Sequence, residues 1–273
     1  MRAKLYILLF IAVLAVSSAS ILVVLTSAPG VVSAFWRLTF SLPIVLLLYR
    51  PRLRVANIKL PLIAGFALSA HFALWMESLF HASVAVSTAI VCMHSIFSGI
   101  FSSLFGEKPK PNHVIGVIIA ILGVYLLSGA DFRADFIGIA FAFLGAVFGG
   151  LYFAIGRLAR FEDFSSYIFL TYLFATVFAL FICLLTGVDL VGYPLRTWLF
   201  FILLAVIPMM LGHTLLNYVL RYMHVVPVTA SVIGEVVGSA ILAYLILGQA
   251  LSVVAYLYIV IILLGIAITL FRT

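Results

Sequence analysis

Residues 199–207 read LFFILLAVI and residues 256–264 read YLYIVIILL, two runs of nine residues without a charged side chain. A membrane β-strand alternates apolar and polar residues over about ten positions, whereas these runs are continuous and typical of helices that cross a bilayer. The whole chain shares this composition. Of its 273 residues, 66% are hydrophobic and 8% are charged, against about 25% charged in soluble domains. The sequence therefore predicts an all-α, polytopic membrane protein.

Gly, Pro and charged residues divide the chain into ten apolar segments. They lie at about 5–25, 33–49, 61–80, 83–104, 113–128, 136–156, 165–186, 197–220, 227–247 and 251–271. The first segment also resembles a signal peptide, because Arg2 and Lys4 precede an apolar run with small residues near Ser17. We predict that it stays in the chain as a helix, since the apolar run continues through Leu25.

Basic residues are distributed unequally between alternate loops. With cytoplasmic termini, the inner segments hold 12 of the 15 Lys and Arg residues, the outer loops hold Arg133 and Arg196, and Arg37 lies within the second segment. Such an excess is the positive-inside signal. We therefore expect a multi-pass protein of the cell membrane with both termini in the cytoplasm. Topology also explains the net charge of +7, whereas a nucleic-acid partner would require basic residues gathered on a solvated face.

An offset of 142 residues aligns the two halves of the chain. It places His71 on His213, and Gly106-Glu107 on Gly248-Gln249. Matches at several polar and glycine positions with one offset favour an internal repeat over a chance alignment of apolar helices.

Each half contains five of the predicted helices, an odd number, so the second half is expected to be inverted in the membrane relative to the first. We predict two inverted five-helix repeats, residues 1–130 and 131–273. Such repeats are typical of secondary transporters, which bind substrate near the midplane between them. Gly116 and Gly265, in the last helix of each half, predict close helix contacts.

Both halves resemble the EamA-type family of the drug/metabolite transporter superfamily. The resemblance rests on residues 71–75 (HFALW) and Gly106-Glu107 in the first half, and on residues 211–218 (LGHTLLNY) and Gly234-Glu235 in the second. It implies a ten-helix carrier, and most such carriers export amino acids, metabolites or toxic compounds. It also implies a site between the third, fourth, eighth and ninth helices, with Arg37 contributed by the second.

The sequence departs from the family pattern at a few positions. Ser95 and Val236 stand where the family often has proline, and Gln249 stands where a Glu is usual. Glu77 replaces an uncharged residue.

Three charged residues lie inside the predicted helices. A charge at the bilayer centre costs about 2.5–3.5 kcal/mol, so retained charges are functional candidates. Glu77 is near a helix end, where it can reach water, whereas Glu235 is about 12 Å deep at 1.5 Å per residue. Arg37, about 20 Å from the cytoplasmic boundary, can hold a substrate carboxylate or pair with a protein acid.

Further candidates are aromatic and polar residues that share helix faces near the midplane. His71 and Trp75 are four residues apart, as are His213 and Asn217 exactly one repeat later, and His94 lies on the fourth helix. An alternative is that the histidines only hydrogen-bond neighbouring helices. We predict a substrate-binding site made of Arg37, His71, Trp75, His94, His213, Asn217 and Glu235.

We expect a secondary carrier for a small-molecule substrate, acting as an exporter by alternating access. Its energy is expected from a gradient, because no phosphate-binding loop is present, and a coupling proton is plausible since Glu235 and the membrane histidines titrate. Cys92 and Cys183 fall in apolar runs without a disulfide or zinc pattern. We expect no cofactor, no metal and no enzymatic activity. The alternatives are an exchanger of phosphorylated or nucleotide-linked sugars, and an intramembrane enzyme or non-transporting partner subunit.

Overall fold

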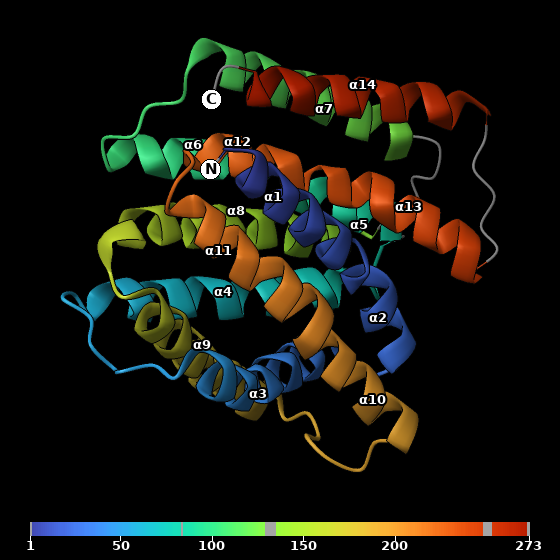
Figure 1. Cartoon of the computed structure of the whole chain (residues 1–273). Helices are drawn as coiled ribbons and strands as arrows, with labels where there is room; N and C mark the ends of the chain where they lie inside the picture. Colours follow the sequence, from blue (N-terminus) through green and yellow to red (C-terminus); the bar gives the residue numbers. More distant parts are fainter. Residues whose placement is uncertain (1, 83, 129–134, 248–252, 272–273) are drawn as a thin grey trace.

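The computed structural model describes residues 2–82, 84–128, 135–247 and 253–271, and their regular structure is entirely helical (Figure 1). The helices of the first half are α1 (Arg2–Ser17), α2 (Ala19–Thr26), α3 (Gly30–Tyr49), α4 (Lys59–Ser78), α5 (Val84–Val91), α6 (His94–Leu104) and α7 (Pro111–Ser128). Those of the second half are α8 (Phe136–Leu158), η1 (Ala159–Phe161), α9 (Phe164–Thr186), α10 (Leu195–Leu204), η2 (Ala205–Thr214), α11 (Leu215–Leu220), α12 (Val225–Val232), α13 (Gly234–Leu247) and α14 (Val253–Leu270). The predicted all-α fold is confirmed.

The apolar helices coincide with the segments that the sequence predicts. Eight of them in the described chain are long and apolar enough to cross a membrane, and two shorter ones occupy Pro111–Leu126 and Leu257–Leu270. Large apolar side chains face outward, including Leu47, Phe136 and Leu195, which are 76%, 84% and 86% exposed. Such a surface is stable against lipid and not against water. The chain is therefore a multi-pass membrane protein, and the number of ten crossings stays a prediction.

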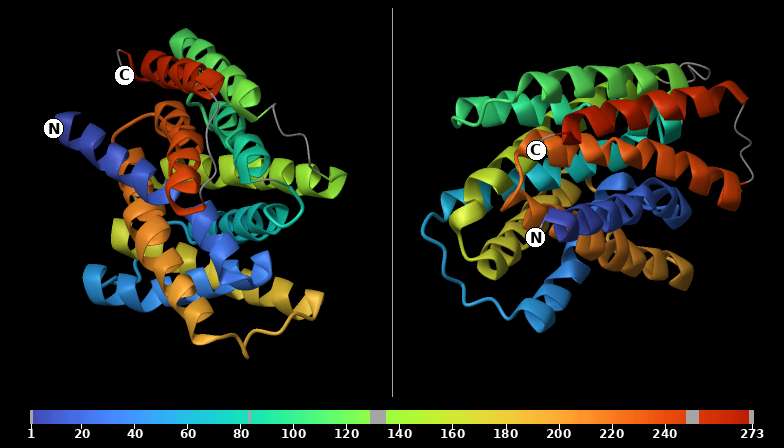
Figure 2. Two further views of the ribbon diagram at one scale, coloured as in Figure 1. Left: turned by 90° about the vertical axis from the view of Figure 1, so that its right-hand side faces the viewer. Right: turned by 45° about the horizontal axis from the view of Figure 1, so that its top comes forward.

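The helices pack in corresponding pairs in the two halves. α4 packs against α8 and α9, and the η2–α11 segment packs against α1 and α3. Likewise α6 packs against α8, and α12 and α13 against α1. α7 and α14 lie side by side at one edge of the bundle, and Figure 2 shows this pair opposite α3, α9 and α10. The molecule therefore has the two-repeat architecture that the sequence offset indicates.

The contact between α7 and α14 depends on glycine. A Cβ atom added to Gly116 would lie 2.6 Å from the carbonyl oxygen of Gly265, and one added to Gly265 would meet the backbone of Ala120. Only hydrogen fits at these positions, so the two backbones approach closely in the way that small residues permit in membranes. The predicted close contact at Gly116 and Gly265 is confirmed.

Three of the predicted continuous helices are interrupted, which corrects the sequence-based segments. The breaks lie at Ser18 between α1 and α2, at Cys92-Met93 between α5 and α6, and at Ile233 between α12 and α13. Ile233 follows Cys92 by 141 residues, within one residue of the repeat offset. The second and third breaks therefore occupy equivalent places in the two halves.

Tightened turns make these breaks without proline. The amide N–H of Met93 donates to the carbonyl of Ile90 at 3.0 Å, and that of Ser95 donates to Cys92 at 3.2 Å. At the other break, the N–H of Val236 donates to the carbonyl of Ile233 at 3.1 Å. These bonds span three residues rather than four, the 3₁₀ pattern that is common where helices change direction. Helix breaks thus form although Ser95 and Val236 replace the family's frequent prolines.

Candidate functional site

A small cavity lies where the interrupted helices meet. Two residues that line the cavity flank each break. They are Val16 and Ala19 at the first break, Val91 and His94 at the second, and Val232 and Glu235 at the third. The remaining lining residues come from α4, α8 and η2. Interrupted helices bring helix ends, with their exposed backbone dipoles, to the middle of a membrane protein. Transporters place substrate sites at such ends.

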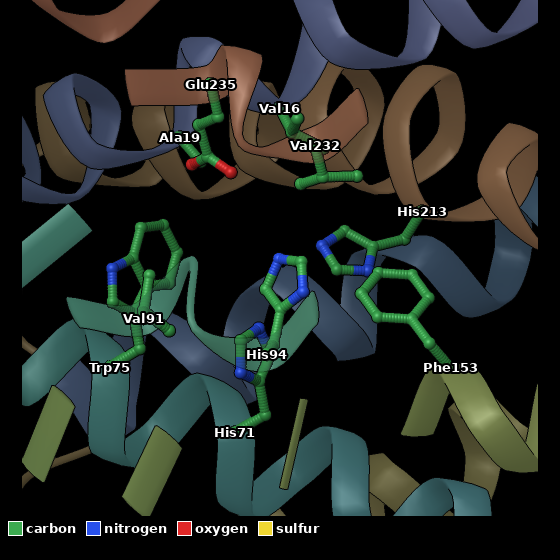
Figure 3. A pocket seen from close by; sticks show the side chains of 10 residues that line it. All are labelled: Val16, Ala19, His71, Trp75, Val91, His94, Phe153, His213, Val232 and Glu235. Atoms are coloured by element: carbon green, nitrogen blue, oxygen red, sulfur yellow. The ribbon is translucent and has the colours of Figure 1, made fainter. Parts of the chain in front are cut away.

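Five of the seven residues predicted for the site line this cavity: His71, Trp75, His94, His213 and Glu235. Figure 3 shows their side chains converging from different helices, with the carboxylate of Glu235 opposite the imidazoles of His71 and His94. Glu235 is 7% exposed and lies in the first turn of α13. The positive end of a helix dipole stabilises a negative charge there. The local sequence therefore places a carboxylate where the fold favours it.

A hydrogen bond fixes the orientation of His71. Its Nδ1–H donates to the carbonyl oxygen of Gly145 on α8 at 2.8 Å. A carbonyl can only accept, so Nδ1 carries the proton and Nε2 of the neutral ring remains an acceptor. A Cβ at Gly149 would lie 2.8 Å from the same Nδ1 atom, so this glycine is what admits the ring. The imidazole also stacks on Trp75 with an interplanar angle of 8°.

His213 faces His71 from the other half of the chain, with 6.2 Å between the ring centroids. It stacks on Phe153 with an interplanar angle of 9°, and it forms a T-shaped pair with Phe72 in which the ring centroids are 5.0 Å apart. The two histidines that the 142-residue offset aligns therefore lie opposite each other across the cavity.

The turn that carries His213 is π-helical. Pro208 lies inside this segment, and proline has no N–H for the usual helical bond. The hydroxyl of Thr214 donates to the carbonyl oxygen of Met209 at 3.1 Å. Single π-helical turns inside helices are frequent at functional sites.

Several buried polar atoms of the lining lack hydrogen-bond partners among the described residues. They are Nε1 of Trp75 and the Nδ1 atoms of His94 and His213. Buried polar groups are nearly always paired in stable proteins. A bound molecule in the cavity would satisfy them.

Arg37 is not among the residues that line the cavity, but it contacts a ring that packs against one of them. The guanidinium carbon is 4.0 Å from the centroid of the Phe72 ring, and Phe72 in turn contacts His213. The side chain is completely buried, and none of its nitrogens has a hydrogen-bond partner among the described residues. The prediction that Arg37 binds substrate stays untested, and its cation contacts an aromatic face instead.

Asn217 also lies outside the lining, one turn after His213. Its Nδ2 donates to the hydroxyl of Tyr152 at 2.6 Å and to the carbonyl of His213 at 2.9 Å. These bonds tie the end of the π-helical segment to α8. Substrate binding by Asn217 stays a prediction, whereas its contacts give it a positioning role for His213.

The sequence did not indicate Phe153 or Phe72 as parts of the site. Phe153 lies in an apolar stretch of its helix, so only its spacing of four residues from Gly149 could have pointed to it. Phe72 follows His71 in the motif, but its contact with Arg37 depends on α3, which packs on α4.

An ion pair links the ends of several helices that surround the cavity. Oε2 of Glu107 accepts from Nε of Arg157 at 2.6 Å, and Oε1 accepts from the N–H of Val225 at 2.9 Å. Nη1 of Arg157 also donates to the carbonyl of Leu220 at 2.8 Å. The two side chains are only 13% and 16% exposed. This Glu107–Arg157 pair joins the ends of α6, α8, α11 and α12.

Glu77 lies at a helix end, as the sequence predicts, and binds a backbone group there. Its Oε2 accepts from the N–H of Gly30, the first residue of α3, at 2.9 Å. The carboxylate is therefore an N-terminal cap for α3 and lies outside the cavity lining.

A sequence model described as the EamA-like transporter family matches residues 3–129 and again residues 136–271. The chain belongs to this family. The resemblance found in the sequence is thereby confirmed, and the two matches agree with a two-repeat EamA architecture. The predicted boundary between residues 130 and 131, together with Arg133, Gly248 and Gln249, lies outside the described residues.

Two further comparisons place this EamA protein among transporters and known folds. It is 24% identical over 212 residues to a protein of Clostridium kluyveri named "Uncharacterized transporter", which covers 73% of this chain and 67% of that protein. A crystal structure with 17% sequence identity covers 98% of both chains with a TM-score of 0.83. That second likeness concerns the fold alone. Family membership and the transporter relative make this EamA protein a membrane transporter.

Proposed function

We propose that this EamA protein is a secondary carrier that exports a small metabolite by alternating access, with the cavity as its substrate site. The observation that carries the proposal is the cavity itself. It lies at three helix breaks, is lined from both halves of the chain, and contains buried polar atoms that have no hydrogen-bond partner in the described part of the chain. A site between two repeats that can rock against each other is what alternating access requires.

Contacts between loops support ten crossings with the second repeat inverted. Both oxygens of Glu162 accept backbone N–H groups, from Ala56 and Asn57, and the predicted topology puts all three on the cytoplasmic side. Nε1 of Trp36 donates to the carbonyl of Leu190 at 2.8 Å, in the half that faces outward. These contacts join segments that share a side when both termini are cytoplasmic in the cell membrane.

Single-cysteine labelling tests this topology. An impermeant thiol reagent added to intact cells should label Asp189→Cys, and should label Arg54→Cys only after the membrane is opened. The reason is the excess of basic residues in the inner segments. A parent without Cys92 and Cys183 serves as the unlabelled control. Labelling of Arg54→Cys in intact cells would contradict both the orientation and the inversion.

The alternative of a sugar-phosphate exchanger requires basic groups that meet the phosphate. Among the described lining residues there is no Lys or Arg, and the guanidinium of Arg37 contacts the ring of Phe72. An intramembrane enzyme or a non-transporting subunit predicts no solute flux. Proteoliposomes with purified protein separate these options when they are assayed for counterflow of labelled amino acids, amines and sugar phosphates. Flux of no compound in this panel would contradict the carrier proposal.

The histidine pair should matter to transport. His71→Ala and His213→Ala are expected to lower the initial rate of flux by about tenfold or more, because each removes a ring contact across the cavity of order 1 kcal/mol and a polar group available to substrate. Cys183→Ala and Ile259→Ala, outside the cavity, are the matched controls. The amount inserted is measured in the same membranes. Normal flux in both histidine variants would assign the rings to packing alone.

A further inference from the structure

A groove between α6, α7 and α12 lies beside the central cavity, and α6 is a wall of both. His94 at the start of α6 lines the cavity, whereas the next two residues, Ser95 and Ile96, line the groove. Within the described chain, α6 and α7 both pack against α12 but hardly against each other (Figure 1). We propose that this groove binds an acyl chain of an anionic phospholipid, whose phosphate is held by Lys108 and Lys110.

The groove is apolar and open to the hydrocarbon of the bilayer. Its lining includes Ile100, Val114 and Ile118, which are exposed large apolar side chains of the kind that face lipid. Its volume of about 300 Å³ far exceeds what one water molecule needs, but water requires several polar partners that this lining does not offer. An empty gap would cost the walls their dispersion contacts. A hydrocarbon chain, which the membrane supplies, therefore fits the groove.

One polar side chain of the lining has a donor without an acceptor. Nδ1 of His113 accepts from the backbone N–H of Lys110 at 3.3 Å, so the proton of the neutral ring is on Nε2. Nε2 is buried and has no hydrogen-bond partner among the described residues. The other polar side chains of the lining, two serines, bond within the protein. The groove thus offers an N–H group to an oxygen atom of its ligand, such as that of a lipid ester or phosphate.

Positive charge lies at the mouth of the groove. Pro109 lines the groove, and the residues on either side of it, Lys108 and Lys110, are exposed. The carboxylate of Glu107 is paired with Arg157, so its charge is compensated there. Basic pockets between membrane helices bind the phosphate groups of anionic lipids. The predicted topology puts this loop on the cytoplasmic side, next to the inner leaflet.

The two parts of the site together select one kind of molecule. Free phosphate would meet the lysines but leave the groove empty, and an uncharged lipid would fill the groove but leave the lysines without a counter-charge. A second copy of the chain fits less well, because a two-fold contact at the groove would bring the lysines of both copies close together. An anionic phospholipid satisfies the groove and the lysines at once.

Compounds that contain one or both parts of the lipid test the two requirements. Dioleoyl phosphatidylglycerol, dioleoyl phosphatidylcholine or glycerol 3-phosphate is added to the purified, delipidated protein in detergent, and the midpoint of thermal unfolding is measured. Phosphatidylglycerol should raise the midpoint in a saturable way. Phosphatidylcholine should need a concentration about 30-fold higher, since it gains little from the two lysines, and glycerol 3-phosphate should give no shift. Equal shifts with the two lipids, or a shift with glycerol 3-phosphate alone, would overturn the proposal.

Charge variants test where the phosphate binds. Lys108→Gln combined with Lys110→Gln should weaken the binding of phosphatidylglycerol by about 30-fold and leave that of phosphatidylcholine unchanged. Arg54→Gln combined with Lys59→Gln is the matched control, because it removes two exposed charges near the start of α4, on the same predicted side. This control should bind phosphatidylglycerol like the wild type. Equal affinities in the two double variants would contradict the assignment of the lysines.

Groove variants test where the acyl chain binds. Val114→Trp adds bulk to the lining, whereas Ile115→Trp, at the next residue of α7, places the same ring outside it. The first should weaken binding of both lipids by about tenfold through lost dispersion contacts, and the second should not. Lipid binding like that of the wild type in Val114→Trp would place the chain elsewhere. If Val114→Trp instead abolished self-association, measured by light scattering, and the lipids showed no charge preference, the groove would belong to a second copy. If Val114→Trp does not fold, the lipid panel and the lysine variants decide.

Discussion

Glu235→Gln is expected to insert and fold like the wild type but to lose transport driven by a pH gradient. Glu235 is buried in the cavity wall, where a charge must be paired, protonated or open to water. Gln keeps the size and hydrogen bonding of the side chain, whereas it cannot exchange a proton. A carrier that couples through this carboxylate therefore falls to background in gradient-driven uptake, a loss of about 100-fold or more.

Two assays run in parallel make the result specific. Counterflow at a high concentration of the best substrate in the panel needs no gradient, so the variant should retain it. Uptake driven by an imposed pH gradient in the same proteoliposomes should be absent. Glu77→Gln controls for loss of a membrane carboxylate, because Glu77 caps α3 and does not line the cavity. Normal gradient-driven uptake by Glu235→Gln would end the coupling hypothesis and leave that carboxylate as a structural contact between helices.

Arg157→Met is expected to lower the free energy of unfolding by about 2 kcal/mol, because it leaves the partly buried carboxylate of Glu107 without its arginine partner. Glu107 loses the 2.6 Å ion pair, and Leu220 loses a donor to its carbonyl. Glu107→Gln combined with Arg157→Met should recover part of that loss, since the uncompensated charge is then also removed. Arg196→Met is the control, as Arg196 is exposed and its guanidinium lies over the ring of Phe200.

The same variant reports on access to the cavity. The pair joins four helix ends on the side that the topology puts in the cytoplasm, so its loss should speed cytoplasmic thiol labelling of a cysteine at Val232, which lines the cavity. Unfolding in detergent gives the stability, and labelling of inside-out vesicles gives the access. If stability and labelling were both unchanged, the Glu107–Arg157 pair would neither stabilise the fold nor limit access to the cavity from the cytoplasmic side.

The sequence alone determined the features that depend on the free energy of transferring each residue from water to lipid. Apolar runs gave the helices, their charged flanks gave an expected orientation, and the 142-residue offset gave the repeat, because these quantities sum along the chain without knowledge of neighbours. The cost of burying Glu235 likewise pointed to it before any contact was known. Five of the seven candidate residues consequently meet in one cavity.

The tertiary structure alone decided which helix faces meet, because packing joins residues that are far apart in the sequence. It packed Arg37 against the ring of Phe72, turned Asn217 toward Tyr152, and brought Phe153 to the lining. It also interrupted three helices. The 3₁₀ bonds at Cys92-Met93 and Ile233 form at positions where no proline in the sequence predicts a break. In a membrane, lipid and helix interiors are equally apolar, so hydrophobicity places a helix in the bilayer but does not choose its partner; close packing and hydrogen bonds do.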